Sequence, residues 1–167
     1  KMRQAAEILC QTHLAIKKVI RAGITTKQLD DFANRFIVDH KGAIPAQLGY
    51  GGFPYTLCIS VNDEICHGFP GDYVLKEGDL VSIDNVIEYN GGLADSCWSY
   101  AIGELSDRDQ KLMDVTLESL NKSIDQAVPG NRIGDIGHAI QEYAEVENNF
   151  SVIRDFIGHG IGKEMHE

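Results

Sequence analysis

The sequence predicts an α+β fold in which one structural unit occurs twice, and three patterns support this prediction. Two stretches with helical spacing precede the first β-like run. Two β-rich runs then flank a turn, and a second pair of helical stretches leads to a final β-like run. Helices and strands that occur in separate blocks are typical of α+β domains. A chain of 167 residues is expected to form a single domain.

The first helical pair is expected at residues 2–22 and from about residue 26 onward. Gly23 is a plausible stop for the first helix, and either Thr25 or Thr26 can cap the second. The expected buried stripe of the second helix consists of Leu29, Phe32, Ala33 and Phe36. A loop rich in Gly and Pro follows at residues 42–55, and a short strand is expected at residues 56–61.

The second helical pair is expected at residues 107–128 and 133–147, with a break at Pro129-Gly130 and a strand-like run at residues 150–157. Placing Ala22-Gly23 over this break aligns the first buried stripe with a second one. The aligned residues are Ile136, Ala139, Ile140 and Tyr143. The repeat predicts two halves, residues 1–105 and 106–167, that face each other across a pseudo-two-fold axis with a site between them.

The centre of the chain is expected to form a β-hairpin from residues 80–87 and 93–100, joined by Tyr89-Asn90-Gly91-Gly92. With Tyr89-Asn90 as the loop, Asp84 lies opposite Asp95. With Asn90-Gly91 as the loop, Asp84 lies opposite Cys97, and Asp95 is its diagonal neighbour.

Both registers place the two carboxylates on one face of the sheet. Because like charges at this spacing repel, a divalent cation between them is the favoured explanation. The alternative is that one aspartate caps a turn while the other faces solvent.

Composition limits the classes of function. The net charge of −10 argues against a general nucleic-acid or membrane-surface binder. The four cysteines show no C-x-x-C pairing, which favours a reducing compartment. No apolar run is long enough to cross a bilayer and no signal peptide opens the chain, so a cytoplasmic location is expected. Both ends of the chain look cut, since it begins inside a helical pattern and stops soon after a Gly-His motif.

The run Gly158-His159-Gly160-Ile161-Gly162 is the most unusual histidine environment in the sequence. Three glycines let the backbone approach closely and hold the imidazole in place. A phosphate loop is the competing interpretation, but no Gly-Lys-Ser/Thr follows and the dinucleotide-binding spacing is not met. Taken singly, His67 fits a turn residue and His166 an ordinary polar residue.

Taken together, these motifs resemble those of the type I methionine aminopeptidases, in the order and spacing of that family and over almost the whole chain. The motifs are Tyr50-Gly-Gly-Phe-Pro54, Cys58-Ile-Ser-Val-Asn62, Cys66-His67-Gly68, Asp84 with Asp95, Gly158-His-Gly-Ile-Gly162 and His166-Glu167. The resemblance implies the pita-bread α+β fold. It also implies a two-metal hydrolase that removes the initiator methionine from polypeptides whose second residue is small.

The resemblance implies a role for each site residue. Asp84 would bind one metal, Asp95 both and His159 the other, and the two divalent ions could be Co, Mn, Fe or Zn. His166 would stabilise the developing oxyanion, and His67 would contact the substrate peptide nitrogen.

The resemblance also implies where the substrate binds. The methionine pocket would consist of Tyr50, Phe53 and Met165, and His67 and His166 would also bind substrate. Gln47 stands where some members of the family carry Cys. The implied partners are the N-termini of nascent polypeptides, near the ribosome, and the implied state is a monomer without nucleic-acid or membrane binding.

Two features depart from the family pattern. The family supplies two further metal ligands, both glutamates, from sequence that would follow Glu167, and one of them is the presumed general base. A pocket tryptophan also belongs to that sequence. Residues 1–167 alone are therefore expected to form an incomplete domain and to be a poor catalyst. Asn85 replaces a small or apolar residue, and strand alternation should turn it away from Asp84.

Two alternatives to a methionine aminopeptidase remain open. One is a dipeptidase like prolidase or aminopeptidase P, which resembles this chain in metal ligands but not in the Ile59-Ser60-Val61-Asn62 strand. The other is a non-catalytic pita-bread module that binds polypeptide ends.

Overall fold

A computed structural model describes all 167 residues, which form two compact units. The first unit comprises residues 1–105 together with 159–167, and the second comprises residues 106–158. No helix in the structure is both long enough and apolar enough to cross a membrane. The expectation of one domain with two halves across a pseudo-two-fold axis stays a prediction.

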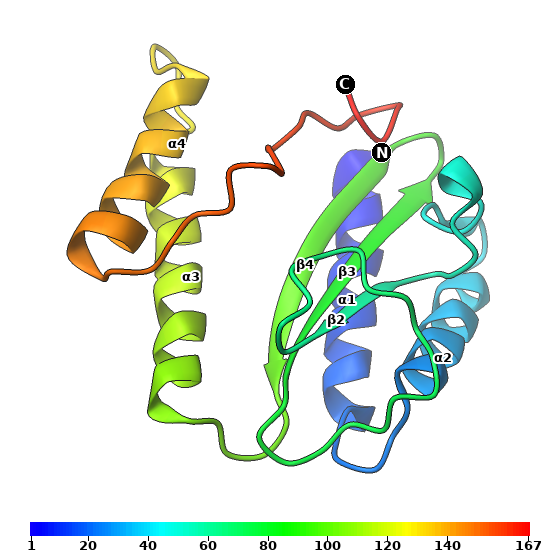
Figure 1. The fold of residues 1–167 in the computed structure, drawn as a ribbon. Coiled ribbons are helices and arrows are strands. Elements are labelled where there is room, and N and C mark those ends of the chain that lie inside the picture. Colours follow the sequence, from blue (N-terminus) through cyan, green and yellow to red (C-terminus); the bar gives the residue numbers. More distant parts are fainter. The chain divides into compact units, whose positions relative to one another are not determined.

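The first unit contains a four-stranded antiparallel sheet centred on β3 (Figure 1). Its strands are β1 (Ala43–Pro45), β2 (Cys58–Val61), β3 (Leu80–Tyr89) and β4 (Leu93–Ala101). β3 pairs with β4 along nearly its whole length, with β2 through its first half and with β1 through its last residues. The expectation of a loop throughout residues 42–55 was wrong at β1. This strand has only three residues, one of them a proline, so it shows no detectable alternation of apolar and polar side chains.

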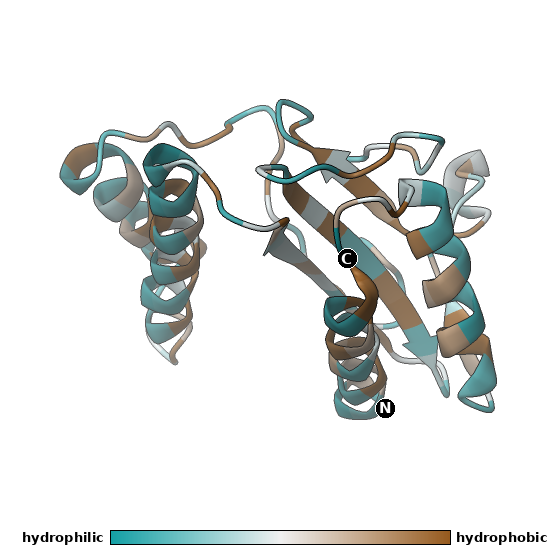
Figure 2. Cartoon of the chain, turned by 90° about the horizontal axis from the view of Figure 1, so that it is seen from below, coloured by the Kyte–Doolittle hydropathy of each residue, from teal (hydrophilic) through white to brown (hydrophobic).

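Two helices, α1 (Met2–Val19) and α2 (Thr26–Asp39), cover one face of this sheet, as Figures 1 and 2 show. Ile16 and Leu29 of these helices are fully buried against Ile83 of β3. Burial of such aliphatic side chains contributes about 1.5–3 kcal/mol each. The helix face of the sheet is therefore the main core of the unit.

Thr25, and not Thr26, is the N-cap of the second helix. Its hydroxyl accepts a hydrogen bond from the Gln28 backbone N–H at 3.0 Å, and the Gln28 side chain accepts one from the Thr25 N–H at 2.9 Å. This reciprocal capping box gives hydrogen-bond acceptors to two backbone N–H groups that have no partner within the helix. The first helix ends at Val19, earlier than residue 22, because Ile20 is already extended.

The hairpin adopts the second of the two expected registers. Asp84 pairs with Cys97 and Val86 pairs with Asp95, so the aspartates are diagonal neighbours. Asn90 and Gly91 both have positive φ, at 54° and 70°. This is the backbone of a type I′ turn, which Asn-Gly favours and which fixes the pairing of the strands.

The second unit contains α3 (Asp107–Asp125), α4 (Ile133–Gln141) and a π-helical turn at Glu142–Glu147. The Ser106 hydroxyl caps α3 by accepting a hydrogen bond from the Asp109 N–H at 3.2 Å. The apolar spacing that predicts α3 does not mark its buried face, since Leu117 is 61% exposed. The buried residues of α3 are Val115, Ser119 and Ser123.

The strand expected at residues 150–157 was wrong, because this segment is irregular. Strands need hydrogen-bonded partners, and the second unit contains no other strand. The segment is instead held by Glu145, which accepts hydrogen bonds from the Val152 N–H at 3.1 Å and from Arg154 at 2.6 Å and 2.8 Å. The second half therefore lacks the final strand that the predicted repeat requires.

Candidate functional site

A cavity of about 260 Å³ lies in the first unit and collects every residue that the sequence singles out as a ligand, catalytic group or pocket wall. Its lining consists of Gln47, Tyr50, Phe53, Cys58, His67, Asp84, Val86, Asp95, His159, Met165 and His166. These residues come from three strands, the loop before β2, the loop after it and the last nine residues. The cavity is therefore assembled from segments far apart in the sequence.

Strand alternation explains why the carboxylates face this cavity. On β3, Val81, Ile83 and Ile87 pack under the helices. Residues of the opposite parity, Asp84 and Val86, point to the other face. On that face the diagonal pairing places Asp84 near Asp95 of β4.

The two carboxylates form an electrostatically strained pair. Burial, the negative charge of Asp95 and a hydrogen bond with Asp95 raise the pKa of the Asp84 carboxyl above its ordinary value. The amide of Gln47 opposes this shift, since its Nε2 donates a hydrogen bond to Asp84 Oδ2 at 3.0 Å. Two half-buried carboxylates that hydrogen-bond to each other are a typical environment for a cation, which allows both to ionise.

The imidazole of His159 directs a hydrogen-bond acceptor toward the pair of carboxylates, Asp84 and Asp95. Its Nδ1 lies 3.0 Å from the Gly160 carbonyl oxygen, which can only accept, so Nδ1 carries the proton. The Nε2 of the neutral imidazole is then an acceptor, and it lies 3.7 Å from Asp95 Oδ2. Histidines that bind metals commonly donate their other ring N–H to a carbonyl in this way.

These donors fit divalent ions as two pairs that share Asp95. One pair is Asp84 with Asp95, and the other is Asp95 with His159. No group of three His, Cys, Asp or Glu side chains is arranged to hold a single ion. Carboxylate oxygens and imidazole nitrogens suit Zn, Mn, Fe or Co, so the chemistry of the donors fits a divalent metal without selecting one.

The other two histidines lie beside this donor set. Tyr50 Oη is 2.9 Å from His166 Nδ1, and the imidazoles of His159 and His166 have ring centroids 4.3 Å apart. His67 lines the cavity with a φ of 57°, a left-handed conformation that is costly for a non-glycine residue. Such backbone strain is concentrated at functional sites.

An apolar wall closes one side of the cavity. Met165 is buried in a cluster with Val86 and Leu93, and Ala46 and Ile161 pack against them. This wall faces the same space as the carboxylates. The cavity thus combines acceptors for a cation with a surface for an apolar side chain.

The sequence did not indicate two contacts of Asp84. The first is with Cys58, its partner on β2, whereas its partner on β4 is Cys97, as one of the two expected registers requires. Burial, followed by the charge of Asp84, raises the pKa of the Cys58 thiol to about 12. The thiol therefore stays protonated at neutral pH, which disfavours a role for Cys58 as a nucleophile or thiolate ligand. The second missed contact is the hydrogen bond from Gln47, which depends on a loop conformation that no local pattern reveals.

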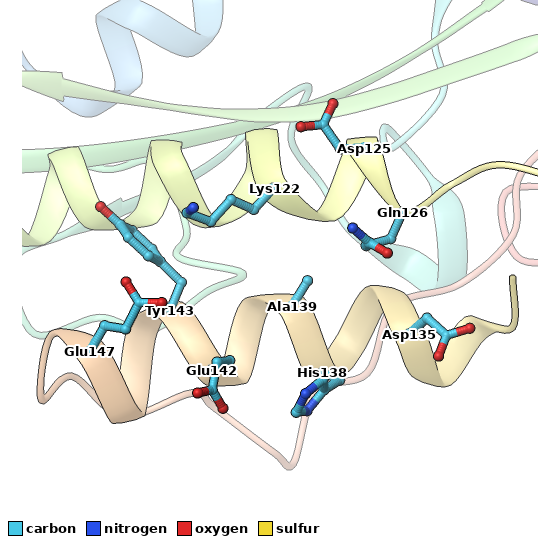
Figure 3. Close-up of a pocket in the computed structure, with 9 residues that line it drawn as sticks. All are labelled: Lys122, Asp125, Gln126, Asp135, His138, Ala139, Glu142, Tyr143 and Glu147. Carbon is cyan, nitrogen blue, oxygen red and sulfur yellow. The ribbon is translucent and has the colours of Figure 1, made fainter.

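A larger groove of about 440 Å³ lies in the second unit between α3 and α4 (Figure 3). The ammonium group of Lys122 lies 4.8 Å from the centre of the Tyr143 ring. The carboxylates that line the groove, such as Asp135 and Glu142, are exposed residues on helix surfaces. Exposed charges of this kind remain solvated, whereas burial and a neighbouring carboxylate raise the pKa of Asp84 in the smaller cavity, which is therefore the better candidate for chemistry.

Comparison with known proteins identifies the family of the chain. Residues 1–167 match the model of metallopeptidase family M24. The chain is 51% identical over 166 residues to methionine aminopeptidase 1 of Bacillus subtilis and 48% identical to the methionine aminopeptidase of Clostridium perfringens. Each alignment covers 99% of this chain and 66% of the relative, so the chain spans slightly less than two thirds of the length of these curated relatives.

Solved structures show the same relationship. The methionine aminopeptidase of Rickettsia prowazekii superposes with a TM-score of 0.96 at 41% identity, over 99% of this chain and 66% of that one. An X-Pro aminopeptidase from Thermotoga maritima reaches a TM-score of 0.79 at 26% identity, over 100% of this chain and 46% of that one. The expected α+β pita-bread fold is therefore confirmed. The family model spans every residue of the chain, and the protein belongs to metallopeptidase family M24.

Proposed function

We propose that the protein is a metal-dependent aminopeptidase that removes the N-terminal methionine from newly made polypeptides whose second residue is small. The observation that carries the proposal is the single cavity in which carboxylates, three histidines and an apolar wall meet. Support also comes from relatives named methionine aminopeptidase at 41–51% identity, against 26% for the X-Pro aminopeptidase.

We assign Asp84 to one divalent ion, His159 to a second and Asp95 to both. Bound divalent ions would lower the pKa of a coordinated water and so supply hydroxide near neutral pH. Gln47 holds one carboxylate oxygen of Asp84 in place through its 3.0 Å hydrogen bond. The Gly160 carbonyl fixes the tautomer of His159, so its Nε2 faces Asp95.

The remaining residues are assigned to the peptide. His166, oriented by Tyr50, would donate a hydrogen bond to the oxygen that gains charge during attack on the scissile carbonyl. His67 would contact the peptide nitrogen. Tyr50, Phe53 and Met165 would hold the methionine side chain, since Met165 is buried in the apolar wall.

The expected setting follows from the same assignment. The substrates would be the ends of nascent chains in the cytoplasm, where the initiator methionine is removed near the ribosome, and the enzyme would act as a monomer. The net charge of −10 makes direct binding to nucleic acid unfavourable.

Peptide hydrolysis by the full-length, metal-loaded protein tests the proposal. We expect cleavage of Met-Ala-x peptides. Met-Leu-x should be rejected because its second residue is large, and Leu-Ala-x because leucine replaces methionine in the pocket. Equal rates on all three peptides would show that the pocket assignment is wrong. Preference for x-Pro peptides would favour a dipeptidase of the prolidase type.

A further inference from the structure

Three aromatic rings pack against one another beside the cavity and are not part of the buried core. Phe53, Tyr55 and Phe69 have ring centroids 5.2–5.8 Å apart and interplanar angles of 66–84°. We call these three residues the aromatic rim. Phe53 also lines the cavity, whereas Phe69 is 63% exposed. The rim therefore leads from the cavity to the surface.

Mutual packing explains the angles between the rings but not the exposure of Phe69. Edge-to-face pairs are favourable in themselves, yet most of the Phe69 side chain remains in contact with water. A large apolar side chain laid on this ring would remove further apolar surface from water.

The segment that carries Phe69 is anchored on both sides. The Gly68 carbonyl accepts a hydrogen bond from the Ile59 N–H at 2.9 Å, and the Gly68 N–H donates to Ser60 Oγ at 3.1 Å. A Cβ atom at Gly68 would lie 2.2 Å from the Ile59 carbonyl oxygen, so only glycine fits there. Two residues after Phe69, the Gly71 N–H donates to Thr26 Oγ1 at 2.9 Å. The backbone on both sides of Phe69 is therefore fixed by hydrogen bonds within the protein, and a backbone fixed in advance lowers the entropy cost of binding.

The size of the cavity requires most of a peptide substrate to lie outside it. At about 260 Å³ it is smaller than the roughly 300–1,000 Å³ of pockets that enclose drug-sized ligands. It has room for an N-terminal residue and the bond to be cut, while the following residues must leave over the surface. Phe69 is two residues along the chain from His67, the cavity residue assigned to the peptide nitrogen, and its ring packs on Phe53 of the cavity.

We propose that the aromatic rim is a subsite for a large apolar side chain at the third position of the peptide substrate. In an extended peptide the first and third residues are about 7 Å apart. The ring centroids of Phe53, beside the first residue, and Phe69, beside the third, are 5.2 Å apart, which is a similar distance. A small second residue leaves this path open. The proposal rests on the proposed function and adds a determinant of specificity to it.

The test compares Met-Ala-Phe-Ser with Met-Ala-Ser-Ser as substrates of the full-length, metal-loaded enzyme. The wild type should prefer the first peptide by about threefold to tenfold in kcat/KM, the range that one aromatic pair supplies. In Phe69→Ala the ratio of the two values should fall toward 1, mainly through KM. Phe69→Leu should retain part of the preference. Leu14→Ala, which removes an exposed apolar side chain from α1, should retain all of it.

The outcomes separate this proposal from the one on which it rests. A wild-type ratio of 1, or an undiminished ratio in Phe69→Ala, overturns the subsite while cleavage of both peptides upholds the aminopeptidase. Cleavage of neither peptide by the wild type contradicts the proposed function instead. If Phe69→Ala does not fold, Tyr55→Ala removes a second ring of the rim, and an unchanged ratio in that variant overturns the subsite as well.

Discussion

His159 Nε2 lies 3.7 Å from Asp95 Oδ2, and neither atom carries a proton when the imidazole is neutral and the carboxylate ionised. Two acceptors in this arrangement repel each other unless a cation lies between them. Asp95 also hydrogen-bonds with Asp84, so it belongs to both donor pairs. We therefore expect metal binding to depend most on Asp95.

Asp95→Asn should therefore weaken metal binding more than a change at either partner. Loss of a supporting contact typically costs about 10–100-fold in metal affinity, and we expect loss of the shared ligand to exceed about 100-fold. Calorimetric titration of the full-length protein with Mn²⁺ measures it. Asp72→Asn, at an exposed loop position, is the matched control and should leave the affinity unchanged. Equal affinities in the two variants would remove Asp95 from the site.

Gln47→Leu should lower metal affinity by about 10–100-fold without removing a ligand. Its Nε2 is 3.0 Å from Asp84 Oδ2, and leucine has similar bulk but no donor. The same titration applies, with Gln4→Leu on the exposed face of α1 as the control. Unchanged affinity in Gln47→Leu would mean that Asp84 is positioned by the strand alone.

Asn85→Val should stabilise the protein, in contrast to most substitutions in a core. Asn85 is fully buried on the helix face of β3, and neither its Oδ1 nor its Nδ2 has a hydrogen-bond partner in the structure. An unsatisfied buried amide costs about 1–3 kcal/mol, and valine also favours strands. We expect the free energy of unfolding in urea to rise by about 1 kcal/mol or more. A lower value would show that Asn85 has a stabilising partner, such as a buried water.

His13 should make the protein less stable in mild acid. The ring is fully buried, stacks on Trp98 at 4.8 Å and lies 2.9 Å from Tyr100 Oη through Nδ1. Burial lowers the pKa of His13 from 6.5 to about 4, against a smaller opposing effect from the Ser96 carbonyl. Between these values the unfolded chain binds more protons, so the stability present above pH 6.5 is lost as the pH falls toward 4.

At about 1.4 kcal/mol per pKa unit this contribution reaches at most about 3.5 kcal/mol. Urea unfolding of the wild type and of His13→Phe from pH 7 to pH 4.5 measures it. The variant keeps a ring beside Trp98 but cannot titrate, so its stability should fall less steeply with acid. Parallel pH profiles would show that His13 does not contribute to acid sensitivity.

Local chemistry made much of the fold predictable. Thr25 with Gln28 forms the capping box that the Thr-x-x-Gln spacing allows, and the turn at Asn90-Gly91 gives the hairpin. The choice between two registers required the positive φ of both turn residues, which the sequence permits but does not impose.

The two errors in the strands share one cause, which is dependence on a partner outside the local segment. β1 exists because the end of β3 offers it hydrogen bonds, and residues 150–157 remain irregular because the second unit offers none. The site residues were found through motifs and a family resemblance. The contact from Gln47 to Asp84 joins residues 37 positions apart and could be seen only in three dimensions.

We propose that Asp84, Asp95 and His159 are the residues of this chain that hold divalent metal. Anomalous diffraction from a crystal of the full-length protein grown with Mn²⁺ tests it most directly. We expect anomalous peaks between Asp84 and Asp95 and between Asp95 and His159, with metal–ligand distances of about 2.0–2.3 Å. A bound ion that contacts none of these three side chains would contradict it.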